Sequence, residues 1–599
     1  MNLRNSIWIS SCYFYSLWTF SNQAVFCQKS YQTSKDVFDY IVVGGGPGGL
    51  AVASRLSQHP NIKVLVLEAG GDGLNNTAIS VPGLFINAVL SPVDWNYTTI
   101  PLEKAGNQSL IYPLGKVLGG TSALNHLVSS KASRADYDAI EQLGNPGWGW
   151  TEFDKASKES EKLLFPNEPN NFSFIAEQHG LHGPVKNSFP KYFPPTFPNY
   201  FPAVKELHHQ PALVDGFGGY VEGPYVYPST IDENAERVTS ATAYYFPFKS
   251  RPNLVVRLNC EVDRLLTSKS SNGDVIIKGV RYDSLGSTYH VEARKEVILS
   301  AGPIGSPAIL ERSGVGEPAT LEKLGIPILI DLPGVGSNLM DHPLAWTVFQ
   351  LSPGQISADD FSRNSTFARE AWNLYRDHRE GILTHEEIAE GLEYLRTNTS
   401  SLPESILETV KERILNGTPI EFVLINQRSL NMQPSANASY ISNLIALQYP
   451  LSRGTSHISS RDPRKPPLID TGFFRHPFDL WLLSKASKHA RAIMKSPSWS
   501  SIISNEHLPG PQVNTDQEWR QYVTNSAGTV FHPVGTAAML PRELGGVVNP
   551  DLQVYGTQRL RVIDASIIPM HLAMHPHMTV YAIGEIGAKK ILKSGGYKA

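Results

Sequence analysis

Residues 38–70 read FDYIVVGGGPGGLAVASRLSQHPNIKVLVLEAG, and no other stretch constrains the fold of the chain as strongly. The short apolar run Tyr40–Val43 predicts a buried strand, and Val64–Leu67 predicts a second one. Between them, small and apolar residues recur with helical spacing. A strand, a helix and a second strand in this order form a βαβ unit, which is the building block of parallel sheets. The sequence therefore predicts an α/β domain that begins near residue 38.

Glycines at the turn of this unit indicate what the domain binds. Gly44, Gly46 and Gly49 give the spacing G-x-G-x-x-G, and Glu68 ends the second strand. The first glycine permits a tight turn, the second lets a pyrophosphate approach the backbone, and the third allows close packing of helix and strand. The carboxylate of Glu68 can accept hydrogen bonds from two ribose hydroxyls. The pattern predicts a dinucleotide site, and by itself it leaves FAD and NAD(P) open.

The bulk composition excludes some classes of function. With 599 residues, 41% of them hydrophobic and 18% charged, the chain can build two or more cores of an ordinary globular protein. The net charge is −3, and Lys and Arg are scattered along the sequence. This distribution gives no electrostatic reason to expect a nucleic-acid partner.

The N-terminal segment resembles a secretory leader. Arg4 precedes the apolar and aromatic run Ile7–Phe20, and Val25 and Cys27 fit the −3 and −1 positions of a cleavage site. We therefore expect a signal peptide at residues 1–27. An uncleaved anchor is the alternative, although the run is short for a membrane span. No later stretch has 18 consecutive apolar residues, so we expect no stable membrane insertion.

Glycosylation sequons agree with export. Eight asparagines begin an N-x-[ST] motif, which predicts N-linked glycans: Asn75, Asn96, Asn107, Asn171, Asn364, Asn398, Asn416 and Asn437. Loss of the leader through Cys27 would leave Cys260 as the one remaining cysteine of the sequence. We expect Cys260 to be a buried side chain in a strand over Leu254–Val262.

The later sequence predicts a second domain and a return to the first. Residues 150–235 are rich in Pro, Phe, Tyr and Asn, which favours long loops and short helices covering a site. We expect a helix at Pro307–Arg312 and a short strand at Ile326–Ile330. The small and apolar residues of Ala582–Leu592 predict a closing helix that packs on the first domain. The nucleotide domain would then be discontinuous in sequence.

Four further motifs identify a family resemblance. They are GKVLGGTSALN (115–125), GPIGSPAILERSGVG (302–316), LPGVGSNLMDHP (332–343) and RVIDASIIP (561–569). With the βαβ unit, they resemble the glucose–methanol–choline (GMC) oxidoreductases over nearly the whole mature chain. LGNPGWGW (143–150) and FHPVGTAAM (531–539) resemble the secreted fungal members related to aryl-alcohol oxidase.

The resemblance implies a domain plan and a cofactor. It implies an α/β (α+β) fold with a Rossmann-like FAD-binding region at 38–345, which includes a loop or lid segment at about 150–235. A substrate-binding domain built on an antiparallel sheet and helices would follow at 346–530, and residues 531–599 would return to the FAD domain. Some relatives attach FAD covalently through a histidine after GKVLGG. Because Leu124 occupies that position here and His126 is out of register, we expect non-covalent FAD.

The same comparison implies further cofactor-binding residues. The position of Asp564 implies proximity to the pyrophosphate and ribityl chain, and that of Val262 implies backbone contact with adenine. Gly119, Gly120 and Ser122 would present backbone N–H groups to an anion or a flavin ring, unless they form a plain glycine turn. The implied cofactor-binding residues beyond the first glycine motif are Val117, Gly120, Asn125, Val262, Asp564 and His575.

Two of the 18 histidines match catalytic positions of the family. His532, in the apolar segment FHPVGTA, matches the first position, and His575, in MHPHMTVY, matches the second. A neutral imidazole can take the proton of an alcohol, and a second one can orient the same oxygen. We interpret His577 and His571 as structural. His575 and His577 form an H-x-H pair, but no third ligand with suitable spacing indicates a metal site.

The resemblance therefore implies an FAD-dependent oxidoreductase. Its substrate would be a primary or secondary alcohol, with dioxygen or another electron acceptor reoxidising the flavin, and the expected setting is fungal secondary metabolism. A GMC-fold cyclase or lyase with structural FAD remains the alternative at this stage, because acid–base histidines serve both kinds of chemistry.

Overall fold

The computed structural model describes residues 32–33, 37–166, 174–208, 215–221, 223–270, 273–360, 365–378, 388–391, 408–410, 412–414, 418–429, 432 and 437–597. The predicted signal peptide lies outside the described residues. The same holds for four of the sequons: Asn171, Asn364, Asn398 and Asn416.

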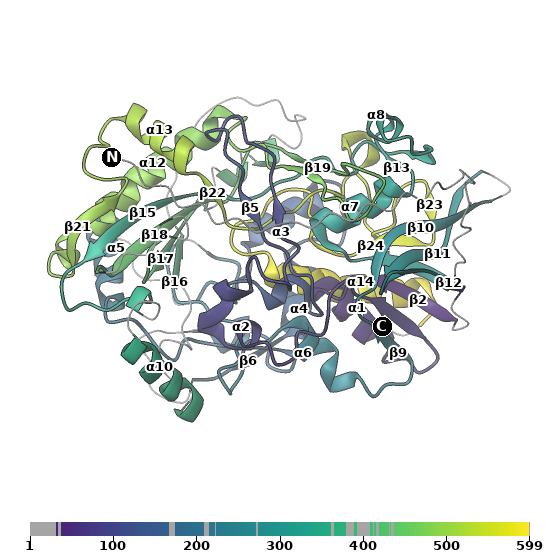
Figure 1. The fold of residues 1–599 in the computed structure, drawn as a ribbon, viewed down its shortest axis with the longest axis horizontal. Helices are drawn as coiled ribbons and strands as arrows, with labels where there is room; N and C mark the ends of the chain where they lie inside the picture. The colour runs from purple at the N-terminus through teal and green to yellow at the C-terminus, as the bar shows by residue number, and fades with distance from the viewer. Residues whose placement is uncertain are drawn as a thin grey trace, which may run out of the picture.

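A nine-stranded sheet forms the right-hand half of the molecule in Figure 1. Its path is β10-β11-β12-β2-β3-β9, with β12, β2, β3 and β9 parallel and β10 and β11 antiparallel to their neighbours. These strands are β2 (Phe38–Val43), β3 (Val64–Leu67), β9 (Leu254–Arg257), β10 (Glu261–Lys269), β11 (Val275–Ser284) and β12 (Ser287–Leu299). Three short strands join them: β1 (Gln32–Thr33), β23 (Thr557–Gln558) and β24 (Leu560–Val562).

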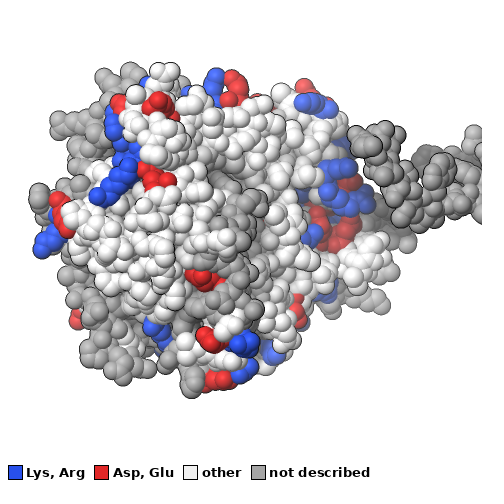
Figure 2. All heavy atoms as spheres, turned by 60° about the vertical axis from the view of Figure 1, so that its left-hand side comes forward, with Lys and Arg blue, Asp and Glu red and all other residues white. Residues whose placement is uncertain are grey.

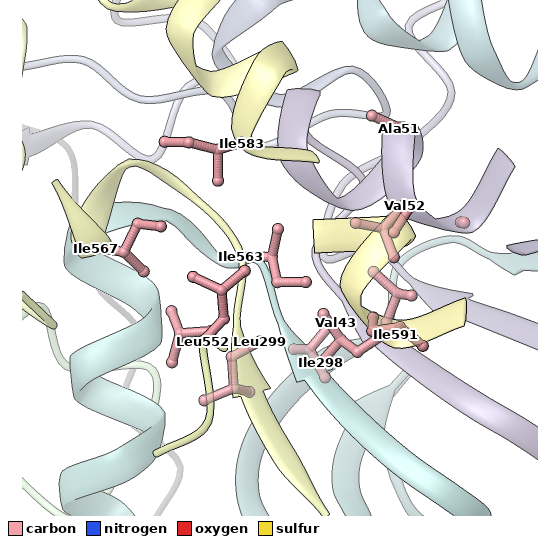
Figure 3. Close-up of a cluster of buried hydrophobic side chains, with 14 of the residues drawn as sticks. Val43, Ala51, Val52, Ile298, Leu299, Leu552, Ile563, Ile567, Ile583 and Ile591 are labelled. Carbon is pink, nitrogen blue, oxygen red and sulfur yellow. The ribbon is translucent and has the colours of Figure 1, made fainter. Parts of the chain in front are cut away.

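The C-terminal segment completes this sheet and its core. β24 pairs in parallel with β12, and α14 (His577–Ser594) packs on α1 (Pro47–Leu56). Figure 3 shows Ile563, which follows β24, and Ile591 of α14 among Val43 and Ile298 of the central strands. The predicted return of the chain to its first domain is confirmed. We call the nine-stranded sheet with α1, α7 (Gly302–Arg312) and α14 the nucleotide lobe.

A second sheet forms the left-hand half in Figure 1. It has seven strands, with the path β21-β15-β18-β17-β16-β8 and with β22 beside β15, and its pairings are antiparallel. The strands are β8 (Gly223–Pro224), β15 (Pro343–Leu351), β16 (Ile388–Gly391), β17 (Ile420–Ile425), β18 (Tyr440–Leu447), β21 (Ile503–Leu508) and β22 (Gly528–Thr529). Helix α12 (Pro477–Met494) packs on this sheet and α13 (Asp516–Ser526) packs on α12. We call this unit the second lobe. The predicted fold class is confirmed.

Shorter elements surround the two sheets. The helices are α2 (Thr77–Ser80), α3 (Arg134–Gln142), α4 (Trp150–Ser160), α5 (Tyr200–His208), α6 (Ser240–Tyr244), α8 (Pro318–Lys323) and α10 (Ser365–His378). The strand pairs are β4 (Tyr97–Thr98) with β5 (Ile111–Tyr112), β6 (Glu161–Leu164) with β7 (Val185–Ser188), β13 (Val315–Gly316) with β14 (Ile330–Asp331), and β19 (Thr455–His457) with β20 (Leu468–Asp470). Among the described residues of the predicted segment of loops and short helices at 150–235 are the helices α4 and α5 and the strand pair β6–β7.

Helix α7 begins at Gly302, five residues before the predicted start at Pro307. A proline inside a helix deprives the carbonyl four residues earlier of its donor. Here that carbonyl belongs to Pro303, and the hydroxyl of Thr536 donates to it at 2.6 Å. A tertiary contact, which the local sequence does not contain, therefore makes the longer helix possible.

Three other local predictions need correction. Of the predicted strand Ile326–Ile330, Ile330 alone is in a strand, the two-residue β14. Cys260 is buried as expected, but it lies in the turn between β9 and β10, where its N–H donates to the Glu68 carbonyl. Helix α14 begins at His577, five residues before the predicted start.

The surface agrees with the modest net charge. On the face in Figure 2, the described Lys and Arg side chains lie beside Asp and Glu side chains, mostly near the margin of the view. Among the residues that the structure describes, the helices include none with the length and apolar character of a membrane-spanning segment.

The packing of α1 against the sheet yields a stability prediction. A Cβ atom on Gly49 would lie 2.1 Å from the Gly44 carbonyl oxygen, so Gly49→Ala should force the backbone apart. We expect a loss of about 1–3 kcal/mol in the free energy of unfolding, measured by thermal or denaturant unfolding of the apoprotein. Gly71→Ala is the matched control, because nothing lies within 4 Å of its added Cβ. Equal stability of the two variants would contradict this account.

Candidate active site

A single cavity extends between the two lobes and brings together most of the predicted site residues. Its wall includes Gly44, Gly46, Glu68, Gly120, Asn125, Val262, Asp564, His532 and His575. These residues come from positions 44 to 575 of the chain, and the return of the C-terminal segment to the nucleotide lobe makes their meeting possible.

Two predicted residues do not line the cavity. Gly49 lies inside α1, where its lack of a side chain allows α1 to approach the β2 turn. Val117 is fully buried and packs with Ile79, Ala88 and Leu124 beneath the loop. Its carbonyl accepts a hydrogen bond from Gly120 at 2.7 Å. Val117 therefore supports the glycine loop, which contains Gly119 and Gly120, from the side away from the cavity.

Glu68 stands at the end of β3 with both carboxylate oxygens bonded to the backbone. Oε2 accepts from the N–H of Gly45 and Oε1 accepts from the N–H of Gly70, each at 2.8 Å. Burial raises the pKa of this carboxyl to about 7, against the opposing effect of these two N–H donors. The carboxylate thus fixes the glycine turn and also faces the cavity.

Three helices begin at the cavity wall. Gly46 and Pro47 open α1, Ala301 and Gly302 open α7, and His577 opens α14. In none of the three does the side chain of the N-cap residue itself accept a hydrogen bond, although at α7 the Gly302 N–H donates to Asp564. Helix N-termini carry a partial positive charge and free N–H groups, so their convergence favours an anionic group such as a pyrophosphate.

Asp564 joins the starts of α7 and the 3₁₀ turn Ala565–Ile567. Its Oδ2 accepts from the Gly302 N–H at 2.9 Å and from the Ser306 hydroxyl at 2.6 Å. Its Oδ1 accepts from the N–H of Ser566 at 2.8 Å. The side chain thus holds the first turn of α7 in place at the cavity.

The glycine loop closes one side of the cavity. Gly119 and Gly120 have φ angles of +107° and +53°, in the left-handed region that glycine tolerates. Asn125 accepts a hydrogen bond on Oδ1 from the Arg237 guanidinium at 2.6 Å. Leu124 presents an apolar side chain to the cavity. His126 also lines the cavity, and its ring packs on Phe85 with a centroid distance of 4.2 Å.

His532 is held by a buried carboxylate at the start of β15. Oδ1 of Asp341 accepts from the backbone N–H groups of His532 and His342, each at 2.8 Å. Oδ2 accepts from the hydroxyls of Tyr112, at 2.8 Å, and Thr529. Burial raises the pKa of Asp341 to about 6, and these four donors oppose the rise.

Two further histidines surround His532. Nδ1 of His342 lies 3.0 Å from Nδ1 of His532, and Nε2 of His342 lies 3.1 Å from the Leu572 carbonyl oxygen. His571 packs against the His342 ring at a centroid distance of 3.6 Å and places Nε2 2.9 Å from the His532 carbonyl oxygen. Burial lowers the pKa of His532 and His342 well below its usual value, and that of His571 to about 3.

His575 has an acidic partner. Its Nε2 lies 3.2 Å from Oε1 of Glu421, which is fully buried on β17. Oε2 of Glu421 accepts from the Gln448 side-chain amide at 2.9 Å. Oε1 of Gln448 in turn accepts from the Met574 N–H at 2.6 Å. The second lobe thus orients a side chain that belongs to the C-terminal segment.

The rings of His532 and His575 face each other within the wall of the cavity. Their centroids are 4.7 Å apart and their planes are nearly perpendicular, at 79°. Each histidine directly follows a residue with left-handed backbone, Phe531 (φ +63°) and Met574 (φ +69°). Such conformations are costly for non-glycine residues and concentrate at functional sites.

His577 also lines the cavity, although its sequence context indicated a structural residue. Its ring packs on Tyr581 at a centroid distance of 4.9 Å, and burial lowers its pKa to about 3. Over the described residues, no group of three or more His, Cys, Asp or Glu side chains is arranged to hold a metal ion.

Comparisons with known proteins now identify the family. The GMC oxidoreductase family models match residues 38–344 and 450–584. The chain is a GMC oxidoreductase. A dehydrogenase from Armillaria gallica is 32% identical over 614 residues, which cover 94% of both chains. An FAD-dependent oxidoreductase from Chaetomium thermophilum has a TM-score of 0.85 and 29% identity, over 94% of this chain and 100% of its own. A fungal aryl-alcohol oxidase has a TM-score of 0.81 and 26% identity, with the same coverage.

The cavity of this GMC oxidoreductase fits its cofactor, FAD. An added Cβ on Gly46 would meet nothing closer than Gly120 Cα at 3.8 Å, so open space adjoins this backbone. The three helix starts suit a pyrophosphate, and Glu68 offers a carboxylate at the position where ribose hydroxyls are recognised. These residues would hold the dinucleotide in the nucleotide lobe, while the two facing histidines lie toward the second lobe.

Sequence reasoning missed four side chains around the histidines. Asp341 and His342 lie in the motif LPGVGSNLMDHP, which served only to identify the family. Glu421 carries a usable signal, because it is a lone charged residue in the apolar run Ile420–Ile425. Gln448 has no comparable signal in the sequence. It links Glu421 on β17 to the Met574 N–H before α14, and this contact exists only in the folded chain.

The raised pKa of Glu68 predicts that FAD affinity depends on pH. Ribose hydroxyls would donate to the ionised carboxylate, so binding should favour loss of the proton that Glu68 carries below about pH 7. The apoprotein should therefore bind FAD more weakly as the pH falls from 8 to 5.5, by up to about tenfold per unit below pH 7. Fluorescence titration of apoprotein with FAD measures the dissociation constant. Glu68→Gln should bind less tightly at pH 8 and show a flatter profile, and an unchanged profile in this variant would contradict the assignment.

Proposed function

We propose that this GMC oxidoreductase oxidises a primary or secondary alcohol to the corresponding carbonyl compound. The facing pair His532 and His575 at the wall of the FAD cavity is the observation that carries this proposal. When bound, FAD supplies a two-electron acceptor for the hydride that leaves the carbinol carbon. The chain itself must take the hydroxyl proton and hold the substrate oxygen.

His532 suits the role of general base. Because its Nδ1 is directed at His342, Nε2 is the ring nitrogen left to meet a substrate hydroxyl. Burial and the neighbouring histidines lower its pKa well below the usual value, so the imidazole is neutral at pH 7 and able to accept a proton. The Asp341 carboxylate fixes the backbone of this residue, which supports a defined position of the base.

His575 suits the role of hydrogen-bond donor to the same oxygen. Its Nε2 is directed at the Glu421 carboxylate, which leaves Nδ1 for the cavity. A proton on Nδ1 would be donated to the substrate oxygen and would oppose the negative charge that develops there.

The second-lobe side of the cavity favours an apolar substrate. Leu344, Trp346, Val423 and Leu444 line it from three neighbouring strands. The charged residues of the wall, Glu68, Glu261, Arg312 and Asp564, belong to the nucleotide lobe. An uncharged alcohol with an apolar body therefore fits this side better than a carboxylate or a polyol.

Anaerobic mixing with candidate alcohols tests the redox proposal. Loss of the oxidised-flavin absorbance on addition of an alcohol supports it, and subsequent admission of dioxygen or another acceptor identifies what reoxidises the enzyme. Formation of a product without any loss of flavin absorbance would overturn the proposal in favour of a cyclase or lyase that uses FAD structurally.

Substitution of the facing histidines tests their roles. His532→Ala should retain FAD and slow flavin reduction by about 10²–10⁴-fold, because a general base contributes that much. His575→Ala should also slow reduction strongly, by about 10²-fold or more, through loss of an oxygen ligand. His575→Asn should be milder, since an amide can still donate. Anaerobic stopped-flow absorbance measures each rate constant.

Two comparisons make this prediction specific. The double variant should lose less than the product of the single effects, because both side chains act on one oxygen. His577→Ala, which removes the other member of the H-x-H pair, should change the rate little. Near-normal reduction in His532→Ala with FAD bound would refute the base assignment, and a larger loss in His577→Ala than in His575→Ala would exchange their roles.

We also propose that the FAD is bound without a covalent link. Leu124 offers no nucleophile at the position that carries the flavin in covalent relatives. Acid precipitation of the purified protein should therefore release all of its flavin as intact FAD, as judged by chromatography of the supernatant. Flavin in the precipitate would contradict this prediction, and mass spectrometry of the flavopeptide would then show whether His126 carries it.

We further propose that the protein is secreted and N-glycosylated. The four described sequon asparagines are exposed: Asn75, Asn96, Asn107 and Asn437. Glycosidase treatment of the protein from its native host should increase its electrophoretic mobility, and N-terminal sequencing should find a start near residue 28. An intact Met1 together with unchanged mobility would contradict both parts.

A further inference from the structure

The hydrogen bonds around His342 determine where its proton resides. The Leu572 carbonyl oxygen can only accept, so Nε2 of His342, 3.1 Å away, must donate to it. A neutral imidazole carries one N–H, and Nδ1 of His342 is therefore an unprotonated acceptor. A backbone carbonyl thus fixes the tautomer of this fully buried ring.

The tautomer of His342 determines the tautomer of the neighbouring His532 ring. Nδ1 of His532 lies 3.0 Å from Nδ1 of His342, and two unprotonated nitrogens at this distance would repel each other. His532 must therefore carry its proton on Nδ1. Its Nε2 then keeps an unshared electron pair, and this is the nitrogen that remains for the cavity.

We propose that His342 is a positioning residue that holds His532 in the tautomer able to act as a base through Nε2. This inference rests on the proposed function, in which His532 takes the proton of an alcohol. The Leu572 carbonyl sets the tautomer of His342, and His342 in turn sets the tautomer of His532. In water, an unconstrained imidazole populates both tautomers, and only the one with bare Nε2 could accept the proton.

The surroundings of His342 agree with a neutral ring. The groups packed on it are the His571 ring, the His532 ring and the backbone next to Asp341. The Asp341 carboxylate is occupied by donors from His342 N, His532 N, Tyr112 and Thr529, and it makes no hydrogen bond to the His342 ring. His571 donates from Nε2 to the His532 carbonyl and accepts on Nδ1 from the Leu572 N–H at 3.0 Å, so it too is a neutral Nε2–H tautomer.

This arrangement has a consequence for the proton that His532 accepts. The hydrogen-bond chain from its Nδ1 ends at the Leu572 carbonyl, which cannot pass a proton on. The proton taken up on Nε2 can therefore leave only toward the cavity. His575 differs, because its Nε2 meets the Glu421 carboxylate and not a backbone carbonyl.

Nitrogen-15 NMR of the holoenzyme tests the tautomer without any substrate. In protein labelled at histidine ring nitrogens, His532 should show a protonated Nδ1 and an unprotonated Nε2, with its signals assigned by their loss in His532→Asn. A protonated Nε2 in the neutral ring would overturn the inference. This result does not depend on whether an alcohol is the substrate, so it separates the inference from failure of the proposed function.

Two variants then test the effect on the reaction. His342→Asn places an amide oxygen near the position of Nδ1 and can still accept from His532, whereas His342→Gln places its amide near Nε2 and leaves no acceptor for His532. With an alcohol that reduces the wild-type flavin, we expect His342→Asn to reduce within about threefold of the wild-type rate. His342→Gln should be about tenfold slower or more, as expected for loss of one hydrogen bond that sets a tautomer.

The controls separate positioning from general damage. Both variants should keep equal FAD content, equal thermal midpoints and an unchanged dissociation constant for the alcohol, so that only the rate constant of reduction differs. Equal rates in His342→Asn and His342→Gln would overturn the positioning role. If either variant failed to fold, the NMR result on the wild-type holoenzyme would decide.

Discussion

The buried carboxylate of Asp341 is the interaction on which the active site depends. It accepts hydrogen bonds from two backbone N–H groups and two hydroxyls, which come from β5, β22, the start of β15 and the loop of His532. A buried carboxylate is costly unless donors surround it, and here the donors are the segments that must stay together. The requirement to solvate one charge thus holds β5, β22, the start of β15 and the loop of His532 together beside the cavity.

The two lobes supply different chemistry to one cavity. The nucleotide lobe contributes the starts of α1, α7 and α14, which suit an anionic dinucleotide. The second lobe contributes an apolar strand surface and the Glu421 carboxylate. Both facing histidines belong to the C-terminal segment, yet each is oriented by a residue at its far side, His342 on one and Glu421 on the other. Under the proposed function, these different partners would let the two imidazoles take different roles on one substrate oxygen.

Much of the fold could be predicted because its signals are local. The βαβ unit shows in the alternation of apolar and glycine residues between 38 and 68, and the closing helix shows in the small residues after position 577. Predictions failed where distant contacts override local preference. The hydroxyl of Thr536 makes Pro307 acceptable inside α7, and the turn at Cys260 follows from a hydrogen bond to the end of β3.

The sequence by itself determined the nucleotide-binding unit, the family and the pair His532 and His575, because each is carried by a short motif whose residues act within one turn or one strand. Only the tertiary structure decided which nitrogen of each histidine faces the cavity. That choice depends on Leu572, His342 and Glu421, which lie up to 230 positions from the groups they contact. A tautomer is set by the acceptor on the far side of the ring, and that acceptor is brought there by folding.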